Sequence, residues 1–289
     1  MKIARTRREL AAALDQLRVT WDSVNLVPTM GALHEGHASL LRAARDSGAV
    51  VLSIFVNPLQ FGPHEDYRAY PRDEQRDLER AEAEDVDLVF APSVDDMLGA
   101  HPATTVSVGR LAAVVEGDAR PGHFDGVATI VATLFNLMRP DRAFFGQKDA
   151  QQVAVIKKMV ADLGFPVELV VCPTVREPDG LAKSSRNAYL SEEDRSRASV
   201  LWEALRAGRT ALSNGRDLAG VEEVMIEVFR STPGVEPGYA RAVNPDTFER
   251  SAPGGPVLLV VAATVGGTRL IDNLVVVERP FGGQDAVGG

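Results

Sequence analysis

The stretch Val24-Asn25-Leu26-Val27-Pro28-Thr29-Met30-Gly31-Ala32-Leu33-His34-Glu35-Gly36-His37 joins a short apolar run to a helical pattern that continues from Ser39. The apolar run predicts a strand over Val24–Val27, so His34 and His37 fall in the first turn of the following helix. At this i, i+3 spacing the two rings share one helix face. Free N–H groups and the positive end of the helix dipole favour an anion such as phosphate there.

The same alternation of apolar, β-branched runs with helical patterns continues through the first half of the chain. It is typical of a parallel sheet covered by helices. Further strands are expected at Val50–Phe55, Leu88–Phe90, Ala143–Phe145 and Val167–Val171, and helices at Asp73–Glu84, Val127–Leu137 and Ala150–Leu163. We therefore predict an α/β fold with a Rossmann-like, doubly wound parallel sheet.

The pattern changes after about residue 174. A polar loop is followed by a long helical stretch from Glu192 to about Leu212, a second helix near Val221–Phe229, and apolar strands near Val257–Ala263 and Arg269–Val277. These elements predict a smaller C-terminal α+β domain. The expected domains are thus residues 1–174 and 175–289, with the Lys183-Ser184-Ser185-Arg186-Asn187 loop in the second.

Composition narrows the class of protein. With 289 residues and 45% hydrophobic content, the chain can bury a substantial core, and its net charge of −9 argues against an extended nucleic-acid surface. The single cysteine excludes an intramolecular disulfide and any cysteine-based zinc cluster. Because no run of about 18 apolar residues occurs, and no long apolar segment follows the positive charges near the N-terminus, nothing indicates membrane insertion or export, and a cytoplasmic location is expected.

The common phosphate-binding motifs of doubly wound folds, Gly-x-Gly-x-x-Gly and Gly-x4-Gly-Lys-Ser/Thr, are both missing from the sequence. Any nucleotide phosphates must therefore be held in another way, and His34 with His37 is the available substitute. Zinc is a competing interpretation, but the i, i+4 spacing of His-Glu-x-x-His is absent. A third interpretation is that the imidazoles merely cap the helix.

Three other clusters carry groups that suit a nucleotide or an acid substrate. Lys183-Ser184-Ser185-Arg186 places two cations around two hydroxyls, which suits a triphosphate unless the segment is only an exposed loop. Gly146-Gln147-Lys148-Asp149 follows a strand, where doubly wound folds place ligands, although Asp149 is also a good helix cap. The amides of Asn57 and Gln60 can recognise hydroxyl and carboxylate groups, or lie in a plain loop.

In their order and separation, these clusters closely resemble the pantoate–β-alanine ligases, a family of the HxGH nucleotidylyltransferase superfamily. The resemblance spans most of the chain. It rests on Pro28–His37, Phe55–Phe61, Tyr70-Pro71-Arg72, Arg120–Phe124, Phe145–Asp149, Ser184–Asn187 and Thr268–Asn273.

The resemblance implies condensation of pantoate with β-alanine, driven by cleavage of ATP to AMP and pyrophosphate with Mg²⁺, through a pantoyl adenylate. It also implies a homodimer. The two-domain layout suggests that the second, smaller domain covers the first, ATP- and pantoate-binding domain as a lid. Residues expected to act on the reacting phosphates are His37, in the family's catalytic-acid position, His34, Lys148 and Arg186. The expected ATP site comprises Met30, Gly31, Ala32, Leu33, His34, Glu35, Gly36, His37, Gly146, Gln147, Lys148, Asp149, Val175, Lys183, Ser184, Ser185 and Arg186. Expected substrate contacts are Gln60 and Gln152, then Asn57, Tyr70 and His123, with Asp77 a candidate Mg²⁺ ligand.

Three positions depart from the family's usual pattern. Gln147 stands where many members have glutamate, Lys183 where many have an apolar residue, and Arg76 precedes Asp77 where many have an acidic pair. The last departure weakens a direct Mg²⁺ role for that segment. Two other functions compete with the ligase: another HxGH-type nucleotidylyltransferase, and a nucleotide-binding module without catalysis. The glutamines argue against the first, since a phosphorylated acceptor would require cations there, and Lys148 with Arg186 argues against the second.

Overall fold

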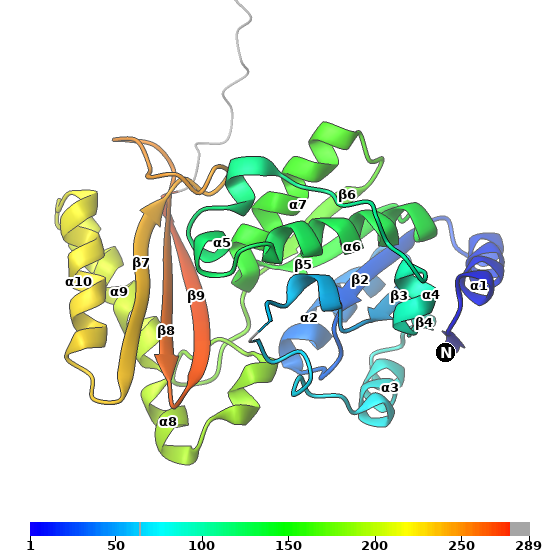
Figure 1. Cartoon of the computed structure of the whole chain (residues 1–289), viewed down its shortest axis with the longest axis horizontal. Helices are drawn as coiled ribbons and strands as arrows, with labels where there is room; N and C mark the ends of the chain where they lie inside the picture. The colour runs from blue at the N-terminus through cyan, green and yellow to red at the C-terminus, as the bar shows by residue number, and fades with distance from the viewer. Residues whose placement is uncertain (64, 278–289) are drawn as a thin grey trace, which may run out of the picture. The chain divides into compact units, whose positions relative to one another are not determined.

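The computed structural model describes residues 1–63 and 65–277. The chain forms two compact units, Met1–Tyr189 and Leu190–Gly289, drawn in Figure 1. Across the described ranges, no helix combines the length and the apolar character that a membrane crossing requires.

The first unit is built on a six-stranded parallel sheet with the strand order β1-β4-β3-β2-β5-β6. The strands are β1 (Lys2–Ala4), β2 (Val24–Thr29), β3 (Ala49–Ile54), β4 (Leu88–Phe90), β5 (Arg142–Gly146) and β6 (Glu168–Cys172). The order reverses at β2, from which the chain winds towards β4 on one side and towards β6 on the other. The predicted doubly wound sheet is confirmed, and its switch point lies between β2 and β5, where such folds bind ligands.

Helices cover both faces of this sheet. The helices of this unit are α1 (Arg7–Thr20), α2 (Glu35–Arg45), α3 (Glu74–Ala83), α4 (Val94–Leu98), α5 (Glu116–Ala119), α6 (His123–Met138) and α7 (Ala150–Leu163), with the 3₁₀ turns η1 (Pro58–Gln60), η2 (Gly109–Ala112), η3 (Gln147–Asp149) and η4 (Ser185–Tyr189). Figure 1 shows α2 and α3 below the strands, and α6 and α7 above them. The core on the α2 side joins Leu41 and Ala81 to the sheet residues Val27, Leu52 and Phe144.

The second unit is a three-stranded antiparallel sheet in the order β7-β8-β9, against which α9 and α10 pack. Its elements are α8 (Glu192–Arg197), α9 (Val200–Ser213), α10 (Leu218–Arg230), β7 (Val235–Val243), β8 (Val257–Val265) and β9 (Thr268–Val277). The α+β class is as predicted, but the single helix expected from Glu192 to about Leu212 is wrong, because the chain forms two helices there. Strand β7 was not expected.

The boundary between the units falls after Tyr189, later in the chain than the expected boundary after residue 174. The segment from Lys183 to Asn187 therefore belongs to the first unit. A physical reason is visible in its contacts: the Ser185 hydroxyl hydrogen-bonds Tyr70, and the Tyr189 hydroxyl donates to the Ala69 carbonyl. These hydrogen bonds attach the loop to the connection between β3 and α3, which belongs to the first unit.

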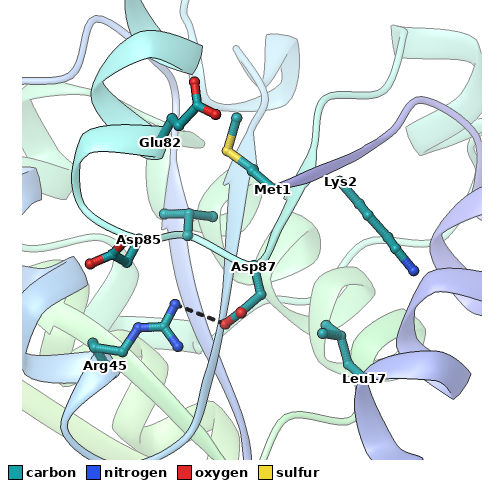
Figure 2. Close-up of a pocket in the computed structure, with 8 residues that line it drawn as sticks. Met1, Lys2, Leu17, Arg45, Glu82, Asp85 and Asp87 are labelled. Atoms are coloured by element: carbon teal, nitrogen blue, oxygen red, sulfur yellow. Dashed lines mark ion pairs between the residues drawn. The ribbon is translucent and has the colours of Figure 1, made fainter. Parts of the chain in front are cut away.

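A hollow of about 880 Å³ lies at the amino ends of β1 and β4 (Figure 2). It is lined by Met1, Lys2, Leu17, Arg45, Glu82, Asp85, Val86 and Asp87. Arg45 and Asp87 form an ion pair of 3.0 Å across it, which Figure 2 marks with a dashed line. Because the strands are parallel, this hollow lies at their amino ends, whereas the predicted nucleotide site lies at their carboxyl ends.

Candidate active site

The imidazoles of His34 and His37 are both fixed by backbone groups at the start of α2. His34 is the N-cap residue, and its Nδ1 accepts a hydrogen bond of 3.1 Å from the Gly36 N–H. The Nδ1 of His37 accepts one of 3.2 Å from the His34 N–H, which completes a reciprocal capping box. The ring centroids lie 4.0 Å apart. The capping interpretation is therefore correct, but it uses only one nitrogen of each ring.

This geometry sets the tautomer and the charge of both rings. Because each Nδ1 accepts a hydrogen bond, a neutral ring carries its proton on Nε2 and presents an Nε2–H donor. Burial, assisted by the nearby Lys148 ammonium, lowers the pKa of His34 from 6.5 to about 4. Burial, then the neighbouring His34, holds the pKa of His37 well below 6.5. Both imidazoles are consequently neutral donors near pH 7.

The glycine between the two histidines has a steric purpose. A Cβ on Gly36 would lie 2.8 Å from His34 Cε1 and 2.9 Å from its Nδ1, so only glycine lets the ring reach the helix end. The expectation of free N–H groups at this helix start needs correction. The Gly36 N–H donates to the His34 ring and the His37 N–H to the His34 carbonyl, so the rings replace these amides as outward donors.

Gln60 ends the turn after β3 and is fixed from several sides. Its Oε1 accepts a 3.0 Å hydrogen bond from Asn57, and its Nε2 lies 3.1 Å from the Met30 sulfur. Its carbonyl accepts from His123 Nδ1 at 2.8 Å and from Arg120 at 3.3 Å. Asn57 is only 1% exposed, and its amide also bonds Leu59 and Gly126. Asn57 and His123 therefore lie behind Gln60 and position it.

Gly126 on α6 makes this packing possible, and its replacement by alanine is our first prediction. A Cβ there would lie 2.2 Å from the Leu59 carbonyl oxygen and 2.6 Å from the Gln60 nitrogen. Gly126→Ala must therefore displace Gln60, and a displacement of about 1 Å should lower kcat/KM for the acid substrate expected at Gln60 by roughly 10²-fold. Steady-state kinetics should show this loss with the KM for the nucleotide unchanged.

Gly62→Ala is the matched control, since a Cβ at Gly62 meets nothing closer than 3.7 Å. A Gly126→Ala variant with wild-type kinetics for the acid substrate would contradict the proposed packing of Gln60 against α6.

The carboxyl end of β5 leads through η3 into α7 beside the switch point. A Cβ on Gly146 would meet no atom within 4 Å, so neither packing nor backbone conformation requires this glycine. Lys148 Nζ lies 3.3 Å from the Asp149 carboxylate. Asp149 occupies the N-cap position of α7, as the alternative interpretation expects, but its side chain makes no cap hydrogen bond there. Gln152 lies at the start of the same helix and is partly exposed.

The Lys183–Arg186 segment carries its own counter-ions. Lys183 donates its N–H to the Val175 carbonyl at 2.9 Å, and its ammonium pairs with Glu177 at 2.5 Å. Arg186 pairs bidentately with Asp66, at 2.9 and 3.1 Å. These carboxylates were not anticipated, because nothing in a single sequence links Asp66 to a residue so far along the chain. The same is true of Glu65, which pairs bidentately with Arg120.

Asp77 is placed differently from the expected metal ligand. It is 3% exposed, and its two carboxylate oxygens accept the backbone N–H groups of Ala32 and Leu33 at 2.9 and 2.7 Å. Within residues 1–63 and 65–277, no group of three or more His, Cys, Asp or Glu residues could hold a metal ion.

Short contacts bring many of the predicted residues close together in the first unit. Met30 contacts Gln60, and Tyr70 contacts Ser185. A Cβ added to Gly36 would lie 3.7 Å from the Lys183 Cβ, so the two segments are adjacent. Lys148 is close enough to both imidazoles to lower their pKa values. A doubly wound sheet with neutral histidines and cations at its switch point defines a nucleotide-dependent enzyme.

Comparison with known proteins identifies the family. The model of the family described as pantoate-beta-alanine ligase matches residues 2–275. A pantothenate synthetase from Caldicellulosiruptor bescii is 49% identical, covering 96% of this chain and 99% of its own. The crystal structure of pantothenate synthetase from Thermus thermophilus is 48% identical, with a TM-score of 0.90 over 96% of this chain and 100% of that one. A pantoate-beta-alanine ligase from Francisella tularensis, complexed with beta-gamma ATP and beta-alanine, is 33% identical, with a TM-score of 0.80 over 95% and 97% of the two chains.

The chain belongs to the pantoate-beta-alanine ligase family. It is accordingly an enzyme, a ligase that joins pantoate to β-alanine with ATP as cosubstrate. This family membership favours the ligase over the competing nucleotidylyltransferase and over a module without catalysis.

Proposed function

We propose that the reaction runs through pantoyl adenylate, with the phosphates of ATP held by the Nε2–H groups of His34 and His37 and by the Lys148 ammonium. The observation that carries this assignment is the use of both Nδ1 atoms by backbone N–H groups. It leaves two neutral, preorganised donors beside a cation at the switch point. Donors of this kind stabilise negative charge that develops on transferring phosphates without having to reorganise.

In the first step, a carboxylate oxygen of pantoate attacks the α-phosphorus, and the bond from that phosphorus to the oxygen bridging to the β-phosphate breaks. Pyrophosphate leaves. In the second step, the amine of β-alanine attacks the acyl carbon, the bond from carbon to the AMP oxygen breaks, and the nitrogen loses a proton to solvent. No enzyme nucleophile takes part.

Gln60 and Gln152 are the proposed pantoate contacts. Because Asn57 occupies the Gln60 oxygen and the Met30 sulfur is only a weak acceptor, the Gln60 amide N–H is available to a carboxylate or hydroxyl. The open space at Gly146 supports a close approach of ligand to the end of β5. Tyr70, whose hydroxyl is hydrogen-bonded to Ser185, is proposed to line the pantoate site next to the Lys183–Arg186 segment.

The Lys183–Arg186 segment, with Val175 beside it, is proposed to complete the triphosphate site. Lys183 and Arg186 would exchange Glu177 and Asp66 for phosphate oxygens, and the Ser184 and Ser185 hydroxyls would donate hydrogen bonds to the same phosphates. Charge-assisted bonds of this kind favour the developing pyrophosphate.

Mg²⁺ is proposed to enter with ATP. The Asp77 carboxylate does not suit a metal ion held by the protein, because both of its oxygens already accept hydrogen bonds from backbone N–H groups. Mg²⁺ retains several waters and needs few protein ligands, so phosphate oxygens and water can complete its coordination. A homodimer and a cytoplasmic location are further proposals that rest on the resemblance, and sedimentation of the purified chain tests the first.

Exchange of labelled pyrophosphate into ATP tests the adenylate step. With Mg-ATP and pantoate, and without β-alanine, we expect the label to appear in ATP. Pantoate omitted, or replaced by an acid that the enzyme does not activate, serves as the blank. An enzyme that makes pantothenate but shows no exchange until β-alanine is added would exclude a step that releases pyrophosphate first.

A further inference from the structure

The turn that precedes the histidine pair is held by a buried carboxylate from a different helix. Asp77 lies in the first turn of α3, and its Oδ2 and Oδ1 accept the N–H groups of Ala32 and Leu33 at 2.9 and 2.7 Å. Two consecutive backbone N–H groups pointing at one anion form a small anion-binding nest. Here the chain's own carboxylate occupies that nest.

The backbone of this turn is strained, and the carboxylate stabilises it. Gly31 and Ala32 have φ values of 81° and 50°, in the left-handed region, which is unfavourable for Ala32 because its Cβ crowds the backbone there. A Cβ on Gly31 would lie 2.7 Å from Asp77 Oδ2. Thr29 Oγ1 accepts the Gly31 N–H at 3.2 Å, so all three successive amides of the turn are hydrogen-bonded.

The conformation of this turn determines where His34 begins α2. His34 follows Leu33 directly, and its backbone N–H holds the His37 ring. A shift of the Ala32 and Leu33 amides would therefore move both imidazoles together. By contrast, a carboxylate that coordinates a metal needs an oxygen that faces the ion. Asp77 is buried, and both of its oxygens accept backbone N–H groups.

We propose that Asp77 is a positioning residue for the imidazole pair, acting through the Gly31–Leu33 turn, and that it is not a Mg²⁺ ligand. This inference rests on the proposed role of His34 and His37 in holding ATP phosphates.

Asp77→Asn tests the proposal, because the amide keeps one acceptor and places an NH₂ group against the other backbone N–H. We expect ATP to bind about tenfold more weakly, the scale of one lost hydrogen bond to a charged group. The KM for pantoate and the Mg²⁺ concentration for half-maximal activity should not change. The weakening should appear equally in calorimetry with ATP in EDTA, and the imidazole NMR signals should shift. Asp73→Asn is the matched control, since Asp73 is an exposed acid that caps the same helix.

A metal ligand would give a different pattern. A loss that added Mg²⁺ restores, or unchanged binding of metal-free ATP, would overturn the proposal. If the variant does not fold, hydrogen exchange of the wild-type Ala32 and Leu33 amides decides instead: both should be protected before any nucleotide or metal is added. Rapid exchange of these amides would overturn the inference. Hydrogen exchange does not depend on the pyrophosphate-exchange assay. A failure of the proposed function can therefore be told apart from a failure of this inference.

Discussion

Replacing His37 by asparagine is expected to lower the rate of adenylate formation by about 10²–10³-fold, the scale for losing one preorganised donor. The asparagine oxygen can still accept the His34 N–H, as Nδ1 does in the wild type. It has no donor at the position of Nε2. His37→Asn should therefore retain the helix cap and the melting temperature while losing the chemistry.

His37→Gln is the complementary variant, because its longer side chain can carry an N–H to the position of Nε2, and glutamine at this position of a capping box can also accept the N-cap N–H. It should retain more of the adenylation rate than His37→Asn, with a melting temperature close to that of the wild type. Single-turnover pyrophosphate release and thermal unfolding measure the two effects. If His37→Asn stays within threefold of the wild-type rate, Nε2 has no part in the reaction.

Lys148→Ala is expected to have an effect of similar size, about 10²–10³-fold on adenylation, because it removes a preorganised cation from the triphosphate. Lys157→Ala is the control, since Lys157 is an exposed lysine on α7. The same variant should alter the His34 imidazole. In the wild type, burial and then the Lys148 charge disfavour the imidazolium and lower the His34 pKa to about 4.

Removing that charge favours protonation, so the His34 pKa should rise in Lys148→Ala. It should remain below 6.5, because burial is the larger cause. Imidazole NMR signals followed over pH give both values. An unchanged His34 pKa would place the ammonium away from the ring, and the proposed phosphate site would lose its central contact.

The long, strongly patterned elements of the fold were predictable from the sequence, and the missed ones have physical reasons. Strand β1 has only three residues and exists through its pairing with β4. Strand β7 contains Pro237 and Gly238 beside a register shift, which interrupts its alternation. Helix α1 did carry a signal, since Thr6 and Glu9 form a capping box. The break before Ser199 has no proline or glycine to mark it.

The site was predictable as a set of residues but not as a set of roles. Local spacing placed both histidines at a helix start, yet only the structure shows that their Nδ1 atoms are already used. Likewise, Asn57 could be recognised as an amide near Gln60 but not as its buried support. Contacts between distant segments, such as Asp66 with Arg186, follow from the tertiary fold and leave no local pattern.

Each cation proposed to bind the triphosphate already has a carboxylate partner: Arg186 has Asp66, Lys183 has Glu177, and Lys148 has Asp149. Without nucleotide these pairs are internally compensated, on a chain whose net charge is −9. A polyanion gains from binding only if its phosphates replace the carboxylates at matching positions, because long-range attraction to a compensated pair is small. Under the proposed function, these ion pairs would therefore favour a triphosphate whose oxygens match their positions over nucleic acids and other loosely matching polyanions.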